Sequence, residues 1–169
     1  MKRTRFSSYE DYREHFRKLI NLERKAQIEL HLKEMKVLSG KERERRGRAI
    51  LNLRAKLLGR GLGGIYLVRY SRTEGVPKTE ISVGDVVLVS IGKPTGKEVQ
   101  GTVVEKTKYY LVIAFTEKPP SYALGKSIRV DLFSNEVTFK RIEEALKYFK
   151  EHPLRDFIIG NKLSKRHII

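Results

Sequence analysis

The stretch ISVGDVVLVSIGKPTGKEVQGTVVEKTKYYLVIAF, residues 81–115, decides the fold class of this chain. It holds three short runs rich in Val, Ile and Tyr, separated by turn-forming residues, which is the pattern of successive β-strands. Similar runs lie on both sides, IYLVRYS at 65–71 and SIRVDLF at 127–133. The run at 108–115 is apolar on both faces, as expected for a strand in a closed barrel or a covered sheet. Five or six such strands predict a small antiparallel β-barrel over residues 62–134.

The segment before the barrel has a helical pattern. Apolar residues recur at spacings of three and four over residues 9–38, which predicts a helix roughly 45 Å long. Ser39 and Gly40 break this pattern, and Ser39 can cap a second helix over about residues 41–58. Because two helices joined by so short a turn pack antiparallel, residues 8–58 are expected to form a helical stalk.

One more helix is expected after the barrel. Asn135 or Thr138 can begin it, and an apolar stripe follows up to His152 and Pro153, which stop it. Residues 135–160 are thus expected to return to the stalk. A basic tail is expected over 161–169. The expected fold class is α+β, with a long antiparallel helical hairpin, a small antiparallel β-barrel and a closing C-terminal helix.

The net charge of the chain is +16, and it is unevenly distributed. Residues 1–60 alone carry 18 basic and 8 acidic groups. Such a field favours polyanions, because each phosphate that is neutralised releases condensed counterions. Solubility is a sufficient explanation for a modest excess of Lys and Arg. At this size the excess favours a nucleic-acid partner over an anionic membrane or an acidic protein.

Several classes of site are excluded by the residues that are absent. The chain has no Cys, so it forms no disulfide and no thiolate metal site. Its four His have no paired metal spacing, and no cofactor is expected. No apolar stretch approaches the roughly 20 residues of a membrane span, and the charged start lacks a secretory signal. We therefore expect a soluble intracellular protein without a membrane partner, cytoplasmic, or nuclear in a eukaryote.

The segment GKPTGKE, residues 92–98, imitates a nucleotide-binding loop without its chemistry. A Walker A loop has four residues between its glycines and a Ser or Thr after its Lys. Here three residues separate Gly92 from Gly96, and Glu98 follows Lys97. Because strands are expected on both sides, the segment is predicted to be a hairpin loop. No nucleophile stands beside a base elsewhere, so no catalytic residue is expected and the chain is not expected to be an ATPase.

Basic residues beside aromatic ones are the candidates for nucleic-acid contact. The hairpin tip at 105–110 places two Lys beside two Tyr, and a Tyr face can stack on a base while Lys meets phosphate. Because side chains alternate along a strand, Tyr109 and Tyr110 point to opposite faces and one of them is expected to be structural. The basic run at 41–48 is a second candidate, although a solvated helix face is its simplest explanation. The selected residues are Arg43, Arg45, Arg46 and Arg48 on the stalk, with Lys93, Lys97, Lys106, Lys108 and Tyr110 on barrel loops.

Four phrases give the chain a family resemblance. They are INLERKAQIE (20–29), GRAILNLRAKLLG (47–59), ISVGDVVLVS (81–90) and SNEVTFKRIEEALKYF (134–149). Their order resembles the amino-terminal region of superfamily 1B helicases of the immunoglobulin-mu-binding-protein type. In that family two stalk helices carry a small β-barrel, the 1B domain, above the first motor domain. The resemblance implies a barrel-on-stalk architecture and covers roughly residues 12–160.

The resemblance also implies a function. Full-length members use ATP to move along single strands, whereas the ATPase motifs are absent from these 169 residues. We therefore expect a nucleic-acid-binding accessory region that grips DNA or RNA, independently of sequence, through phosphate contacts. The alternative is a protein-interaction module that docks through its stalk on a motor domain or on a second copy. A fragment, a truncated reading frame and a free-standing relative are all compatible with the sequence.

Overall fold

A computed structural model describes residues 8–136, 140, 141 and 144 of the chain. The helix expected over 135–160 lies mostly outside these residues, and the basic tail expected over 161–169 lies entirely outside them. The chain divides into two compact units, residues 1–25 with 138–169, and residues 26–137. In the described part of the first unit, Tyr12 and Ile20 are buried. The second unit contains the barrel.

Two helices precede the barrel, α1 (Tyr9–Val37) and α2 (Gly40–Arg45). The hydroxyl of Ser8 accepts a hydrogen bond from the backbone N–H of Asp11 at 3.1 Å, which caps the first turn of α1. Ser39 caps α2 in the same way, because its hydroxyl accepts a hydrogen bond from the N–H of Glu42 at 3.2 Å. The long first helix and the break at Ser39 are therefore confirmed.

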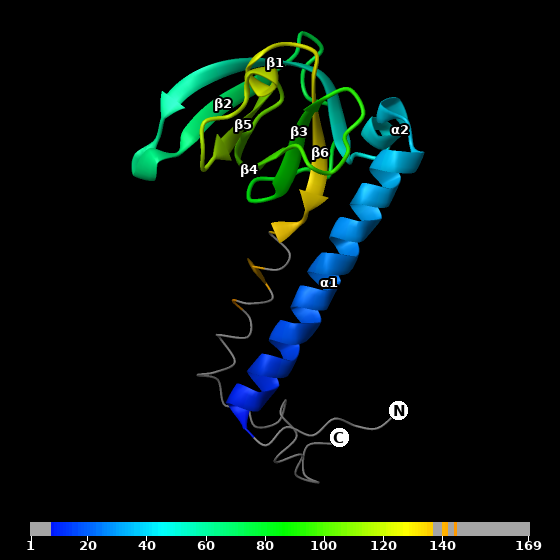
Figure 1. Cartoon of the computed structure of the whole chain (residues 1–169), viewed down its shortest axis with the longest axis vertical. Helices are drawn as coiled ribbons and strands as arrows, with labels where there is room; N and C mark the ends of the chain where they lie inside the picture. Colours follow the sequence, from blue (N-terminus) through cyan, green and yellow to red (C-terminus); the bar gives the residue numbers. More distant parts are fainter. Residues whose placement is uncertain (1–7, 137–139, 142–143, 145–169) are drawn as a thin grey trace. The chain divides into compact units, whose positions relative to one another are not determined.

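Six antiparallel strands close into a barrel in the order β1-β2-β5-β4-β3-β6 (Figure 1). Short 3-10 turns at Leu62–Gly64 and Ser121–Leu124 interrupt the connections. Closure leaves no strand of the barrel with an unpaired edge. The strands are β1 (Ala49–Arg60), β2 (Tyr66–Ser71), β3 (Val86–Ile91), β4 (Val99–Lys106), β5 (Tyr110–Phe115) and β6 (Ile128–Ser134).

The second helix is much shorter than predicted, and the helical hairpin is wrong. Residues 49–60, expected to be helical, form β1, the strand that joins β2 to β6 and closes the barrel. Gly47 ends the helical segment because it has a φ of 80°, in the left-handed region. Its carbonyl then accepts a hydrogen bond from the N–H of Glu80 at 2.8 Å, which directs the chain toward the barrel. Among the described residues before the barrel, there is thus one long helix and one short one.

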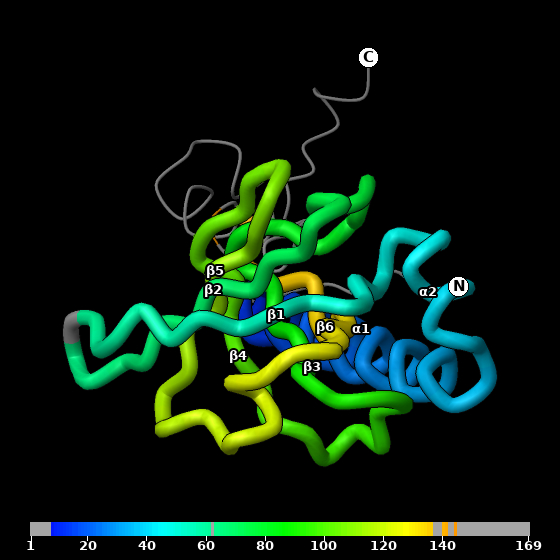
Figure 2. Tube along the Cα trace, turned by 90° about the horizontal axis from the view of Figure 1, so that it is seen from above, coloured from blue at the N-terminus to red at the C-terminus, as the bar shows by residue number. Residues whose placement is uncertain are grey.

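Apolar side chains from all six strands fill the barrel. Leu53, Val68 and Ile113 are among those with no exposed surface. The interior is packed so closely that a Cβ atom on Gly101 of β4 would lie 2.4 Å from Cγ2 of Ile113. Figure 2 shows the end of β1 and the start of β2 reaching out to one side of the other strands.

Arg43 of α2 joins the second half of α1 to the barrel. Its guanidinium is completely buried, and its Nε donates a hydrogen bond to Oδ2 of Asp131 in β6 at 2.9 Å. Its Nη1 donates to Oε1 of Glu34 in α1 at 2.8 Å. Its Nη2 donates to the carbonyls of Arg48 at 3.2 Å and Leu132 at 3.1 Å. One side chain therefore contacts α1, β6 and the residue immediately before β1.

The network extends from both carboxylates that Arg43 contacts. Asp131 also accepts hydrogen bonds from Nε and Nη2 of Arg129, at 2.6 and 2.9 Å. Glu34 also pairs with Arg48. A buried carboxylate is tolerated only when cations and hydrogen bonds replace its hydration, and Asp131 has both.

This network determines which face of α1 is buried. The apolar stripe predicted over residues 9–38 includes Leu30 and Val37, yet these are 50% and 71% exposed. The buried positions in this half of the helix are His31 and Met35. Glu34 lies on the same side of the helix. The face of α1 that contacts the barrel junction therefore combines apolar and charged residues, and part of the predicted apolar stripe is left in solvent.

Replacing Arg43 by Met is expected to reduce the free energy of unfolding by about 3–5 kcal/mol, because Asp131 would remain buried with less compensation. Arg45→Met is the matched control: Arg45 is 76% exposed and pairs with Glu42 across one helical turn. The control should change stability by about 0.5 kcal/mol or less. Urea unfolding of both variants at pH 7 measures the difference, and equal losses would contradict a structural role for Arg43.

His31 should make the protein sensitive to mild acid. Burial, followed by the nearby charge of Arg43, lowers the pKa of His31 to about 4 from its ordinary 6.5. The unfolded chain therefore binds this proton first, so stability is complete above pH 6.5 and falls as the pH drops toward 4, by up to about 3 kcal/mol. The Nδ1 atom of His31 is buried without a hydrogen-bond partner among the described residues. His31→Leu should flatten the pH dependence of urea unfolding between pH 6.5 and 4, and an unchanged slope would exclude this histidine as its source.

Candidate nucleic-acid interface

Lysine and arginine occupy different environments in this protein. Every lysine among the described residues is exposed, and none forms an ion pair with another described residue. The ion pairs between described residues all use arginine. The positive charge that remains free to meet an anion is therefore carried mainly by lysine.

Two of the four arginines selected from the sequence belong to the helix–barrel junction. Arg43 has no exposed surface, and all of its nitrogens are hydrogen-bonded. The side chain of Arg48 is 27% exposed and pairs with Glu34 and Glu80. Neither guanidinium is presented to solvent as a free cation, so we leave both out of the interface.

The other two arginines lie on the surface, Arg45 in the last turn of α2 and Arg46 at its C-cap. Arg45 is 76% exposed and its Nη1 lies 3.1 Å from Oε2 of Glu42. Arg46 is 50% exposed and its Nε lies 3.7 Å from the other oxygen of the same carboxylate. One carboxylate thus faces two guanidinium groups, which leaves a net positive charge on this short helix.

The turn between β4 and β5 presents the predicted pair of lysines. The hydroxyl of Thr107 accepts hydrogen bonds from the backbone N–H groups of Tyr109 and Tyr110, both at 3.1 Å, and this fixes the turn. Lys108 is exposed. Lys106 is exposed as well, although its Nζ donates a hydrogen bond to the carbonyl of Ile81 at 2.9 Å.

The two tyrosines of this turn have different surroundings. The hydroxyl of Tyr110 donates a hydrogen bond to Glu105 at 2.8 Å, and the guanidinium of Arg69 lies 5.5 Å from its ring centroid. Tyr109 is 71% exposed and was not selected from the sequence. The alternation of side chains along a strand predicts that the two tyrosines point to opposite faces, but it does not say which one points outward. That choice depends on where β5 begins, which the sequence did not show.

The β3–β4 loop carries Lys93 and Lys97, both exposed. Strands flank the loop on both sides, so the predicted hairpin loop is confirmed. Glu98 closes it: its carboxylate accepts hydrogen bonds from the N–H and hydroxyl of Thr95 at 2.5 and 2.8 Å, and from the N–H of Gly96 at 2.8 Å. Partial burial alone raises the pKa of Glu98, but these hydrogen bonds outweigh it and lower the pKa overall. The loop is thereby held in one conformation at neutral pH.

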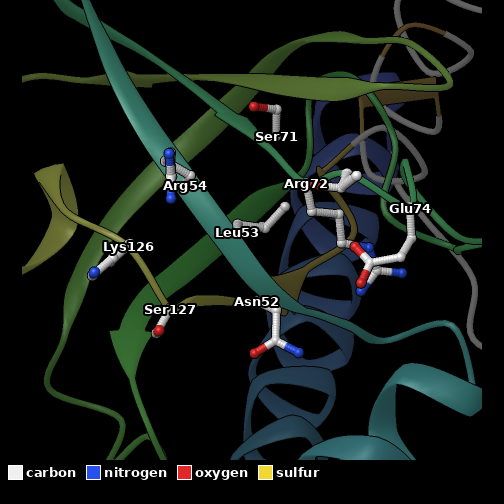
Figure 3. Close-up of a pocket in the computed structure, with 9 residues that line it drawn as sticks. Asn52, Leu53, Arg54, Ser71, Arg72, Glu74, Lys126 and Ser127 are labelled. Atoms are coloured by element: carbon white, nitrogen blue, oxygen red, sulfur yellow. The ribbon is translucent and has the colours of Figure 1, made fainter.

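A polar recess of about 600 Å³ lies where β1 and β6 stop pairing regularly. Figure 3 shows that its lining comes from β1, from the end of β2 and from the segment before β6. Asn52 and Ser127, which both line it, have φ values of 57° and 56° in the left-handed region. Arg72 is fixed here by Glu44 at 2.5 Å, so Arg54 and Lys126 are the exposed cations of this recess.

Metal binding has no structural support in the described part of the chain. Over residues 8–136, 140, 141 and 144, no group of three or more His, Asp or Glu side chains is arranged to hold an ion. Among the same residues, no helix combines the length and apolar character required to cross a bilayer.

The sequence that forms α2, the barrel and most of α1 matches a known domain family. Residues 15–134 match the family model described as Helicase SMUBP-2/HCS1, 1B domain. The match covers all six strands of the barrel, the whole of α2, α1 from residue 15 onward, and the Arg43 network. The chain belongs to this family of helicase 1B domains.

A curated relative agrees with this assignment. The chain is 42% identical over 151 residues to an uncharacterized ATP-dependent helicase of Methanocaldococcus jannaschii. The alignment covers 88% of this chain and 22% of the relative, so the chain spans about a fifth of the length of that helicase. The 169 residues therefore correspond to a 1B region, and the motor domains of the helicase lie outside the matched part.

Proposed function

We propose that this chain is the nucleic-acid-binding accessory region of an ATP-dependent superfamily 1B helicase, and that it grips DNA or RNA through phosphate contacts. The observation that carries the proposal is the exposed, unpaired state of the described lysines in a chain of net charge +16. Membership of a helicase family makes nucleic acid the natural polyanion.

The contacts we propose lie on barrel loops and on α2. Lysine is a compact point charge that meets phosphate without demanding a fixed geometry, which suits a grip that does not read base sequence. Binding should weaken steeply with salt, because each neutralised phosphate releases counterions. The proposed contact residues are Lys93, Lys97, Lys106 and Lys108, with Arg45 and Arg46 on α2 and Tyr109 as a stacking surface.

A second function has some support from α1. Leu30 and Val37 of α1 are 50% and 71% exposed. Exposed apolar side chains of this kind on a helix are suited to docking on a motor domain or on a second copy of the chain. Dimers whose population rises with protein concentration, together with an absence of nucleic-acid binding, would favour this function over the first. Either function belongs to an intracellular, most simply cytoplasmic, protein.

Lys106→Glu with Lys108→Glu is expected to weaken binding to a fluorescent single-stranded oligonucleotide by roughly tenfold or more at low salt, because two phosphate contacts become repulsive. Lys78→Glu with Lys118→Glu is the matched control, since it changes the net charge equally at exposed lysines elsewhere. Fluorescence anisotropy with DNA and RNA at two salt concentrations measures both. If the two double variants lose equal affinity, the turn is not a contact and only the total charge matters.

Tyr109→Ala should cost about 1–3 kcal/mol of binding free energy if a base stacks on the exposed ring. Tyr110→Phe is the control, because it keeps the neighbouring ring and removes only the hydroxyl that bonds Glu105. It should bind with wild-type affinity. The same anisotropy titration reports both variants, and wild-type affinity for Tyr109→Ala would reduce this turn to a purely electrostatic contact.

A further inference from the structure

A second recess of about 680 Å³ lies between the end of α1 and the β3–β4 loop. Lysines from both elements line it, Lys33 and Lys36 from the helix and Lys93 from the loop. Leu32 and Pro94 provide apolar surface between them, and Thr95 completes the lining. The loop lysine was among the residues selected from the sequence, but neither helical lysine was, because nothing in the sequence indicates that the loop reaches α1.

The two walls of this recess are held close together. A Cβ atom on Gly96 would lie 2.7 Å from Cδ2 of Leu32, so the loop backbone packs directly on the helix. Gly96 also has a φ of 98°, a conformation that a residue with a side chain rarely adopts. The carboxylate of Glu98 fixes the same turn from within through its three hydrogen bonds. The loop lysine is therefore presented at a defined position beside the helix.

The charge balance in the recess favours an anion. All three lysines are exposed, and none forms an ion pair with a described residue. Both oxygens of Glu98, the acidic group of the loop, already accept hydrogen bonds from the loop itself. Glu29, one turn before Lys33 on α1, is the acidic side chain nearest in sequence on that face. Three lysines thus line this recess, and its lining includes no carboxylate.

We infer that this recess binds backbone phosphates of a nucleic-acid strand, with Lys33 and Lys36 of α1 acting together with Lys93. The inference rests on the proposed function and extends it by making the helix a wall of the binding surface. The apolar surface of Leu32 and Pro94 suits the carbon atoms of a sugar, which accompany a backbone phosphate in any strand. The contact is therefore expected with both DNA and RNA.

The test compares two triple variants of the full 169-residue chain. The first is Lys33→Gln, Lys36→Gln and Lys93→Gln, and the second is Lys41→Gln, Lys78→Gln and Lys118→Gln. Both remove three exposed positive charges, so general attraction falls equally. Affinity for a fluorescent single-stranded oligonucleotide is measured over a range of salt. Each phosphate contact to a single strand contributes about 0.7 to the slope of log affinity against log salt concentration, so loss of three contacts should reduce the slope by about 2.

The inference is supported if the first triple variant loses this slope and at least tenfold affinity relative to the second. It is wrong if both variants bind alike while the wild-type chain binds tightly, and the proposed function would then survive without it. No binding by the wild-type chain at low salt would overturn the proposed function and this inference with it.

A parallel titration with inorganic pyrophosphate, followed by the amide signals of Thr95 and Gly96, distinguishes binding of a free anion from binding of a strand. If pyrophosphate shifts these signals while the two variants bind the strand alike, the recess is an anion site unrelated to the strand.

Discussion

The buried ion pair between Arg43 and Asp131 is the interaction on which the rest of the structure depends. Arg43 belongs to α2 and Asp131 to the middle of β6, 88 residues later. Through its other nitrogens the same guanidinium contacts α1 at Glu34 and the β1–β6 seam at the carbonyl of Leu132. Because each of these buried charges relies on the other for part of its compensation, the pair favours the register of the seam and the face of α1 that meets the barrel. It also positions the helical wall of the lysine-lined recess.

Arginine and lysine divide the positive charge between structure and surface. Arginine forms several directed hydrogen bonds from a planar group, which suits sites such as Arg43 and Arg72, where three or more acceptors must be satisfied at once. Lysine is strongly hydrated and flexible, and in the described residues it remains on the outside. With this division reversed, the same net charge would be presented at the surface by guanidinium groups.

The barrel and the first helix were predictable because their signals are local. Strands rich in Val and Ile, such as residues 86–91, and the helical period of residues 9–38 depend on neighbours in sequence. β1 was missed because AILNLRAKLLGR has leucines at helical spacing, and only pairing with β2 and β6 makes it a strand.

The role of Arg43 was hidden in a basic run that resembles a solvated surface. Asp131, a carboxylate within the apolar strand SIRVDLF, was the one local sign that a buried cation was required. The recess beside α1 depends on the contact between Leu32 and Gly96, which no local pattern encodes.

The strand that begins the barrel and the strand that ends it are neighbours, since Ala49 pairs with Asp131. The chain therefore enters and leaves the barrel at the same end of one antiparallel pair. A tension applied between the segments that flank the barrel would load the β1–β6 hydrogen bonds one after another, as in unzipping, and would not shear them together. The first bonds to be loaded are those around Leu132, whose N–H donates to the carbonyl of Arg48 at 2.9 Å and whose own carbonyl is held by Arg43. Arg43 is thus placed to resist separation of β1 from β6 at the point where such an opening would start.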